Sequence, residues 1–270
     1  MSSKILRFAQ ALAVTLALGI AGSAQAGLIA IINGASTTSE TSTTSDITTN
    51  LNTLLIAAGN TTTILDTVPA DLSPYGQIWD IRFSNSSPIT ASVETQYLNY
   101  LQNGGGMFVM GENAGFATRN TSVLQLISDA GGGSLNFVTP ASTQDVVSPF
   151  TGPNVIADGN VTYAAPGGVD GSGNGQFITT DGTNGTGVAF GVGDLTNAPT
   201  GALTAIFDVN FMQGTVDQPD SQDLLKNLIG YVQNQVGPGP GTVPEPGTVA
   251  LLGIGLIGMG FARRRMKSAR

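Results

Sequence analysis

The sequence contains neither histidine nor cysteine in its 270 residues. Without histidine, the Ser-His-Asp and Cys-His mechanisms and the usual zinc and transition-metal sites are excluded. Without cysteine there is no disulfide framework, so stability must come from an apolar core, for which the hydrophobic content of 41% is that of a globular protein. We therefore expect no catalytic residues, no metal and no cofactor.

Basic residues are scarce in the middle of the chain. Between Gly27 and Val236 only Arg82, Arg119 and Lys226 are basic, against 17 acidic residues, so this region carries a net charge of 3 − 17 = −14. Such a surface repels phosphate backbones. Nucleic acid is therefore a poor candidate partner, and we expect none.

Residues 1–26 have the three parts of a secretory signal peptide. Lys4 and Arg7 precede an uncharged run at residues 8–21, and Ala24 and Ala26 provide the small side chains that suit signal peptidase. The run is about 14 residues long, which is short of the ~20 residues that a membrane span needs. We expect an exported protein whose mature chain begins near residue 27.

The C-terminal tail has three parts in sequence. A Gly/Pro-rich linker at residues 237–242 leads to Pro244, Glu245 and Pro246, and an uncharged run follows from Thr248 to Ala262. At ~1.5 Å per residue this run predicts a transmembrane helix of roughly 22 Å, which is short for a hydrocarbon core of ~30 Å. The positive-inside rule keeps the closing basic cluster cytoplasmic and the preceding domain outside that membrane. The cluster consists of Arg263, Arg264, Arg265 and Lys267.

The tail resembles the PEP-CTERM sorting signal, in which a Pro-Glu-Pro triplet precedes a short apolar helix and arginines. The triplet at residues 244–246 stands in the expected place, and the resemblance covers residues 243–270. It implies recognition by an exosortase, a membrane transpeptidase expected to cut near the triplet. Carriers of this signal are typically bacterial envelope or matrix proteins associated with exopolysaccharide. The resemblance implies an inner-membrane anchor first, and the cell surface or extracellular matrix after processing.

The apolar run of the tail also contains Gly253, Gly255 and Gly258 at the spacing of a dinucleotide-binding fingerprint. A working fingerprint needs a βαβ unit of about 30 residues and an acidic residue about 20 positions further on. Only 12 residues follow Gly258. The match therefore predicts no nucleotide cofactor.

Strands and helices alternate through residues 27–236, which predicts an α/β fold with a mainly parallel, flavodoxin-like sheet. A Gly/Thr/Asn-rich insertion of short antiparallel strands and long loops is expected between Gly131 and Pro199, and the signal helix and the C-terminal transmembrane helix complete the fold class. The expected strands are 28–32, 61–65, 77–83, 107–110 and 203–209. The expected helices are 47–58 with Asp46 as its cap, a helix between Thr90 and Gly104, 121–129 and 221–233.

The segment from Gly104 to Gly115, GGGMFVMGENAG, is similar to the turn that holds the nucleophile in class I glutamine amidotransferase-like domains. The similarity extends, as a pattern, over residues 27–235 and implies a flavodoxin-like fold. Where that family places its cysteine, this chain has Glu112 or Asn113, and no histidine can serve as its partner. The resemblance thus implies the fold without the amidotransferase reaction.

Polar residues follow the predicted strands of the sheet. Ligands of open α/β sheets bind beyond the carboxyl ends of the strands, so these residues are candidates for a crevice that takes a sugar or another small polar molecule. Asn and Asp are also common in turns and helix caps, which is the simpler interpretation. The candidates are Asn33, Arg82, Glu112, Asn113, Asp208 and Asn210.

Three Asp-Gly loops, at Asp158, Asp170 and Asp181, could offer oxygen ligands to calcium. None of them has the twelve-residue EF-hand spacing, and turn chemistry explains them more simply.

Two functions follow from these patterns. The first is a non-catalytic envelope protein that acts as a structural or exopolysaccharide-associated surface component. The alternative is a hydrolase of extracellular glycans in which Glu112 and Asp208 act as the acid and the base. The alternative requires both carboxyl groups in one cleft, within about 10 Å of each other.

Overall fold

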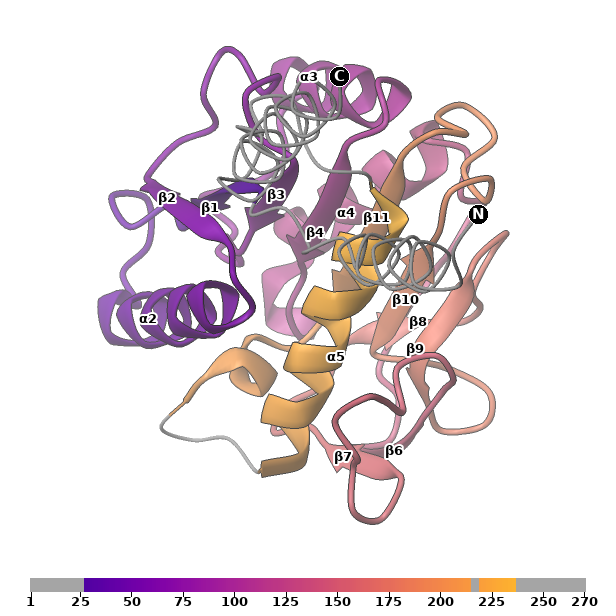
Figure 1. Ribbon diagram of the computed structural model, residues 1–270. Coiled ribbons are helices and arrows are strands. Elements are labelled where there is room, and N and C mark those ends of the chain that lie inside the picture. Colours follow the sequence, from indigo (N-terminus) through magenta and orange to yellow (C-terminus); the bar gives the residue numbers. More distant parts are fainter. Residues whose placement is uncertain (1–26, 215–218, 237–270) are drawn as a thin grey trace, which may run out of the picture. The chain divides into compact units, whose positions relative to one another are not determined.

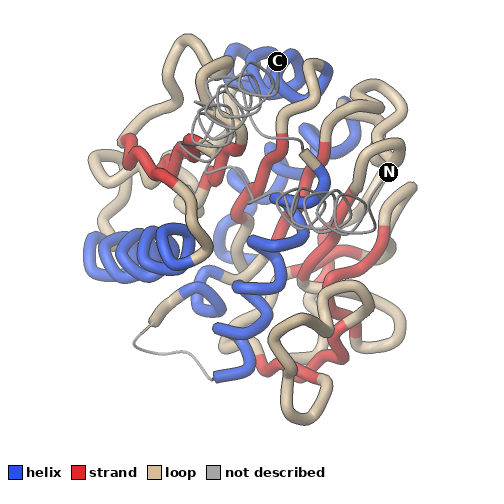
Figure 2. The backbone as a smooth tube through the Cα atoms, in the orientation of Figure 1, coloured by secondary structure: helices blue, strands red, loops and turns tan. Residues whose placement is uncertain are grey.

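The computed structural model describes residues 27–214 and 219–236, and its central element is a nine-stranded mixed sheet (Figures 1 and 2). Five strands are parallel and follow the order β2-β1-β3-β4-β11, which is the flavodoxin-like order 2-1-3-4-5. They are β1 (Leu28–Ile32), β2 (Thr61–Leu65), β3 (Gln77–Asp80), β4 (Gly106–Met110) and β11 (Ala202–Ile206). The predicted mainly parallel α/β domain is thus present.

The second half of the sheet is antiparallel and comes from the Gly/Thr/Asn-rich region, as the composition predicts. Its strands extend the sheet beyond β11 in the order β10-β9-β6-β7. They are β10 (Gly187–Phe190), β9 (Gln176–Thr180), β6 (Thr143–Val146) and β7 (Asn160–Thr162). A separate pair of short strands joins β5 (Phe137–Val138) to β8 (Gly168–Val169).

Four helices cover the two faces of the sheet. The buried residues of α2 (Thr41–Ala57) and α5 (Pro219–Gln235) pack in one cluster with Ile29, Trp79 and Phe108. The buried residues of α3 (Ala91–Gln102) and α4 (Ala117–Asp129) pack in the other with Ala30, Ile78 and Val109. Successive strand residues therefore point to opposite apolar layers, which explains why these strands are continuous apolar runs. In Figure 1, α5 crosses in front of the sheet and α4 lies behind it.

Two helices begin four or more residues earlier than predicted. Helix α2 starts at Thr41 after the N-cap Glu40, so Asp46 lies inside the helix and the prediction of Asp46 as its cap is wrong. Its threonines fit because their hydroxyls donate to carbonyl oxygens one turn back, as Thr48 does to Thr44 at 2.6 Å. Helix α4 starts at residue 117 because a distant side chain, Asn85, accepts from the backbone N–H of Thr118 at 2.9 Å.

Two strands end three residues earlier than predicted, β3 at Asp80 and β11 at Ile206. In each case apolar residues continue past the strand, and Asp208 is the N-cap of the 3-10 helix η2 (Val209–Met212). The predicted signal helix and transmembrane helix lie outside the described residues. Within residues 27–214 and 219–236, no helix combines the length and apolar character needed to cross a membrane.

Candidate functional site

The carboxyl ends of the parallel strands bring the six predicted crevice residues to one edge of the sheet. Arg82 belongs to a buried ion cluster beyond β3, whereas Glu112, Asn113, Asp208 and Asn210 gather beyond β4 and β11. Asn33 follows β1 and belongs to neither group.

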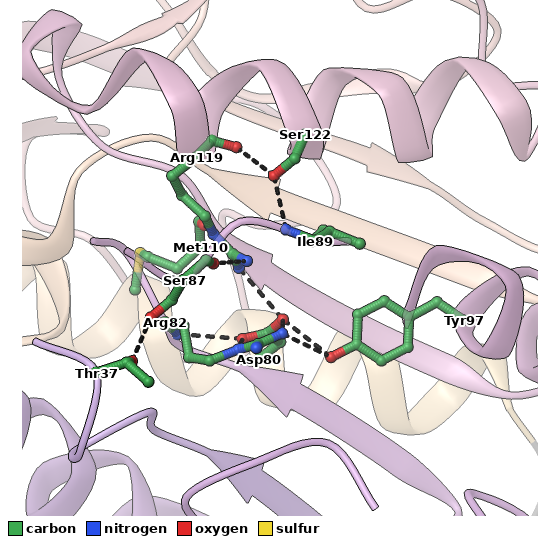
Figure 3. Close-up of polar contacts among 9 residues, drawn as sticks. All are labelled: Thr37, Asp80, Arg82, Ser87, Ile89, Tyr97, Met110, Arg119 and Ser122. Atoms are coloured by element: carbon green, nitrogen blue, oxygen red, sulfur yellow. Dashed lines mark hydrogen bonds and ion pairs between the residues drawn. The ribbon is translucent and has the colours of Figure 1, made fainter. Parts of the chain in front are cut away.

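Asp80, the last residue of β3, is the centre of the ion cluster (Figure 3). The guanidinium of Arg82 donates to both carboxylate oxygens, with Nε 2.8 Å from Oδ1 and Nη2 2.7 Å from Oδ2. Tyr97 of α3 donates its hydroxyl to Oδ2 at 2.9 Å. The two contacts from Arg82 form the bidentate geometry in which an arginine and a carboxylate bind most strongly.

Arg119 of α4 also contacts the carboxylate of Asp80. Its Nη2 lies 3.3 Å from Asp80 Oδ2, close enough for an ion pair but without an aligned hydrogen bond. Its Nε donates to the carbonyl of Met110 at 2.9 Å and its Nη1 to the carbonyl of Ser87 at 3.0 Å. The side chain therefore ties α4 to the end of β4 and to the loop after β3 (Figure 3).

The electrostatics of the cluster follow from burial and charge. Burial alone would raise the pKa of Asp80, but the positive charges of Arg119 and Arg82 hold that pKa far below its usual range. Burial lowers the pKa of Arg119, and the carboxylate of Asp80 opposes this effect. The cluster holds two cations and one anion in the interior of an acidic domain. Its contacts join β3, β4, α3 and α4 and are those of a structural element.

Sequence reasoning missed Asp80, Arg119 and Tyr97. Asp80 lies inside an apolar run, and Arg119 lies in a segment that was predicted to precede its helix. The sequence offered one signal, which was the scarcity of basic residues. Only three occur between Gly27 and Val236, and two of these three lie in this cluster.

Glu112 follows β4 and is almost completely buried, with 2% of its surface exposed. Its Oε2 accepts from the backbone N–H of Val209 at 2.5 Å, and its Oε1 accepts from the side-chain amide of Asn113 at 2.7 Å. The side chain of Asn120 binds both the backbone N–H and the carbonyl of Glu112. Glu112 thus fastens the end of β4 to η2 and to α4.

Asp208 follows β11, the strand next to β4, and is fully buried. Its Oδ1 accepts from the backbone N–H of Asn210 at 2.7 Å, which caps η2, and its Oδ2 accepts from Ala165 at 3.1 Å. Asn210 donates its side-chain amide to Gln213. Asn113 caps the 3-10 helix η1 (Ala114–Phe116) by accepting from the N–H of residue 115.

Burial dominates the electrostatics of both carboxyl groups. Burial raises the pKa of Glu112 to about 7, and the charges of Asp208 and of Glu40 act in the same direction. Burial also raises the pKa of Asp208. The structure thus places the predicted acid and base at the ends of adjacent strands. Both carboxylates accept from backbone N–H groups there and act as buried caps.

Asn33 has the contacts of a turn residue. Its Oδ1 accepts from the N–H of Ala35 at 3.1 Å. Gly34 follows with φ +59°, and a Cβ there would lie 2.8 Å from Cγ of Arg82. Glycine therefore lets the loop after β1 pass closely over the ion cluster.

Two of the three Asp-Gly loops are held by their own aspartates. Asp170 accepts from the backbone and side chain of Asn136, and Asp181 accepts from the N–H groups of Ala141, Thr183 and Asn184. In the described part of the chain, no group of three or more Asp or Glu side chains is placed to hold a metal ion.

Comparison with known proteins identifies the tail. Residues 242–265 match the PEP-CTERM protein-sorting motif. The chain carries a PEP-CTERM sorting motif. The motif includes the predicted triplet Pro244, Glu245 and Pro246, and these residues, the basic cluster and the cleavage residues Ala24 and Ala26 lie outside the described residues. A PEP-CTERM motif is associated with export and with sorting by exosortase.

The PEP-CTERM match spans 24 residues, so the domain was compared separately. No curated protein matches the sequence.

Among solved structures, the mmIFT52 N-terminal domain aligns with a TM-score of 0.57 at 13% identity over 76% of this chain and 97% of that one. An exo-β-1,4-mannosidase, Op5Man5 from Opitutaceae bacterium strain TAV5, aligns with a TM-score of 0.51 at 11% identity over 83% of this chain but only 38% of its own. A ThuA-like protein from Bacteroides uniformis aligns with a TM-score of 0.48 at 14% identity over 79% of this chain and 94% of its own. At these identities the first two likenesses concern the fold alone.

Proposed function

We propose that this protein is an exported bacterial cell-envelope protein that is sorted by exosortase through its C-terminal tail. The observation that carries the proposal is the PEP-CTERM motif at residues 242–265. Signal peptidase removes residues 1–26, the run at residues 248–262 holds the chain in the inner membrane, and processing near the triplet releases the domain to the cell surface or extracellular matrix. The short apolar run supports this order because it makes a weak anchor.

Within this proposal the domain at residues 27–236 acts without catalysis, as a structural or exopolysaccharide-associated surface component with an amidotransferase-like fold. Its support is the use of the polar residues at the carboxyl edge. Glu112, Asn113 and Asp208 cap η1 and η2, and Arg82 is bound to Asp80. Side chains committed to such contacts stabilise loops and are not free to act on a substrate.

The sorting step is tested by changing the triplet alone. Replacement of Pro244, Glu245 and Pro246 by alanine leaves the apolar run and the basic cluster intact, so full-length protein should accumulate in the membrane fraction. A second variant that ends after residue 241 should pass directly into the soluble exported pool. Processing of the alanine variant at the parental rate would refute a sorting role for the triplet. A glycan array probed with residues 27–236 tests the association with polysaccharide.

A second candidate function, a carboxylate-dependent hydrolase of extracellular glycans, is favoured by one observation. The pKa of Glu112, raised to about 7, is that of a general acid at neutral pH, and Asp208 follows the adjacent strand. The candidate requires η2 to move, because both buried carboxyl groups accept from its backbone N–H groups. Release of reducing sugar that disappears in both Glu112→Gln and Asp208→Asn variants would establish it, and release that persists in either variant would eliminate it.

A further inference from the structure

The nine-stranded sheet ends in two edge strands, β2 and β7, which differ in how well they are protected. Folded proteins protect the edges of sheets with short strands, charged side chains, prolines or bulges. Strand β7 has three residues and closely follows Asp158. Strand β2 has five residues, TTTIL, with no charge and no proline, and it pairs in regular register with β1 along its whole length (Figure 1). Strand β2 is therefore an unprotected edge.

The open edge of β2 presents backbone hydrogen-bonding groups. The N–H of Thr61 and the carbonyl of Leu65 form hydrogen bonds with the residues just before and just after β1, at 3.2 and 2.9 Å. Because successive residues of a strand turn their backbone groups to opposite sides, the N–H and C=O groups of Thr62 and Ile64 point away from β1. Within the described residues, no hydrogen bond joins these four groups to another segment. Two donors and two acceptors are therefore available along this edge.

Apolar side chains flank the same edge. Ile64 is 48% exposed, and Ile56 in the last turn of α2 is 54% exposed. The hydroxyl of Thr62 donates to the side chain of Asn52 at 2.5 Å, so α2 lies next to β2 at this point. Ile56 is one turn beyond Asn52 on α2, and Ile64 shares a strand face with Thr62. The two exposed isoleucines therefore lie on either side of the contact between α2 and β2.

The charge distribution indicates what pairs with this edge. No charged residue occurs between Asp46 and Asp66, and this is the longest such interval in residues 27–236. The rest of the domain carries the net charge of 3 − 17 = −14, so its other surfaces repel a second copy. A basic partner would be attracted to those surfaces and would find no counter-charge on β2. The uncharged edge is thus where two copies can approach each other without like-charge repulsion.

We propose that two copies of this protein pair through β2, antiparallel and about a two-fold axis at Thr63. In this register Thr62 of each copy lies opposite Ile64 of the other, and each such pair exchanges two backbone hydrogen bonds. All four open groups of each copy are then satisfied, and one continuous sheet runs through both domains. Such a contact uses the same surface on both copies, as a closed dimer requires. The proposal depends neither on the sorting signal nor on polysaccharide.

The same register brings side chains together across the axis. Thr62 and Ile64 are on the face of the sheet that α2 covers, because Thr62 contacts Asn52. Each Ile64 would lie beside Thr62 of the other copy and diagonally opposite the other Ile64, and β-branched neighbours of this kind stabilise strand pairs. The axis repeats every contact, so a single substitution acts twice.

The absence of cysteine allows a direct test of the register. Thr63→Cys introduces one thiol per chain at the proposed axis, where opposite residues have Cα atoms about 4.5 Å apart, a separation that a disulfide can bridge. The control Val192→Cys places its thiol at a 50% exposed residue in the loop after β10. Both are made in residues 27–236, which contain both apolar layers of the domain. After oxidation we expect a covalent dimer as the main product of Thr63→Cys, and monomer from Val192→Cys.

Sedimentation equilibrium measures the pairing without a cross-link. Ile64→Glu places a negative charge from each copy at the paired edge and should weaken the dimer by about tenfold or more, whereas Val192→Glu adds the same charge at a similarly exposed residue and should change it by less than about twofold. Thr62→Pro removes one outward N–H and keeps the hydrogen bonds to β1, so thermal unfolding should still show a folded domain while the dimer is lost. High salt should strengthen the parent dimer by screening the repulsion between acidic copies.

Four results would overturn the proposal. A parent that stays monomeric at millimolar concentration and high salt has no such interface. Equal cross-linking of the two cysteine variants, or equal weakening by the two glutamate variants, would place the contact elsewhere. A folded Thr62→Pro variant that dimerises like the parent would mean a contact without strand pairing. An exported Thr63→Cys protein that cross-links to a different protein, and not to its own copy, would assign the edge to another partner.

Discussion

Asp80 and Arg119 form an ion pair that lies wholly inside the protein, with Nη2 of the arginine 3.3 Å from Oδ2 of the aspartate and neither side chain exposed. The two residues come from β3 and α4, and Arg82 completes the pair to a cluster of two cations and one anion. A buried charge that loses its partner is costly, so this cluster should respond strongly to single substitutions.

Replacement of Asp80 by Asn should lower the free energy of unfolding by about 3 to 5 kcal/mol, because it leaves two buried guanidinium groups without a counter-ion. Urea denaturation followed by tryptophan fluorescence measures this, since Trp79 is adjacent in sequence and buried. The control is Lys226→Gln, which breaks the exposed pair with Asp223 and should cost about 0.5 kcal/mol or less. Equal effects of the two substitutions would contradict a stabilising role for the cluster.

Low pH should destabilise the domain through the same carboxylate. The folded pKa of Asp80 lies below its ordinary value of 3.8, so its contribution to stability is fully present above that pH and is lost as the pH falls through the folded pKa. Acid denaturation of the parent should therefore steepen below about pH 4. In Asp80→Asn this steepening should be absent.

Glu112 has the opposite linkage. Its folded pKa of about 7 lies above the ordinary value of 4.5, so the folded state binds the extra proton and stability falls as the pH rises from 4.5 to 7. The total loss is about 3 kcal/mol by the linkage relation. Glu112→Gln should remove this pH dependence in urea titrations between pH 5 and 8. A variant with the parental pH dependence would assign the proton uptake to another group.

Two glycine substitutions separate a packing requirement from helix propensity. A Cβ at Gly111 would lie 2.2 Å from Cδ1 of the buried Phe207, so Gly111→Ala should destabilise the domain by about 1 to 3 kcal/mol through overpacking. Gly230 lies inside α5 with no atom within 4 Å of the added Cβ, so Gly230→Ala should stabilise it by about 0.5 to 1 kcal/mol. Thermal unfolding of both variants provides the check.

Export should remove the first 26 residues. The small side chains of Ala24 and Ala26 suit signal peptidase, so the exported protein should begin near Gly27. N-terminal sequencing of envelope material measures this directly. Retention of residues 1–26 in that material would mean that the segment is an uncleaved anchor.

The sequence predicted the architecture because its signals are local. Apolar runs at residues 28–32 and 107–110 and the helical periods between them are sufficient to predict the parallel part of the sheet. The start of α4 was not predicted because its cap, Asn85, is distant in the chain. The roles of Asp80 and Glu112 depend on partners 39 and 97 positions away, Arg119 and Val209, and only the fold brings these residues together.

The course of α5 has a consequence for how the domain is attached. The helix returns to the amino end of the sheet. There, a Cβ added to Gly106 at the start of β4 would lie 2.9 Å from Cγ1 of Val236. The described chain also begins at this edge, with Gly27 just before β1. Both covalent connections of the domain therefore leave from one pole. The loops after β3, β4 and β11 lie at the opposite pole, so a fusion tag or surface coupling at either end of the domain should leave these loops unobstructed.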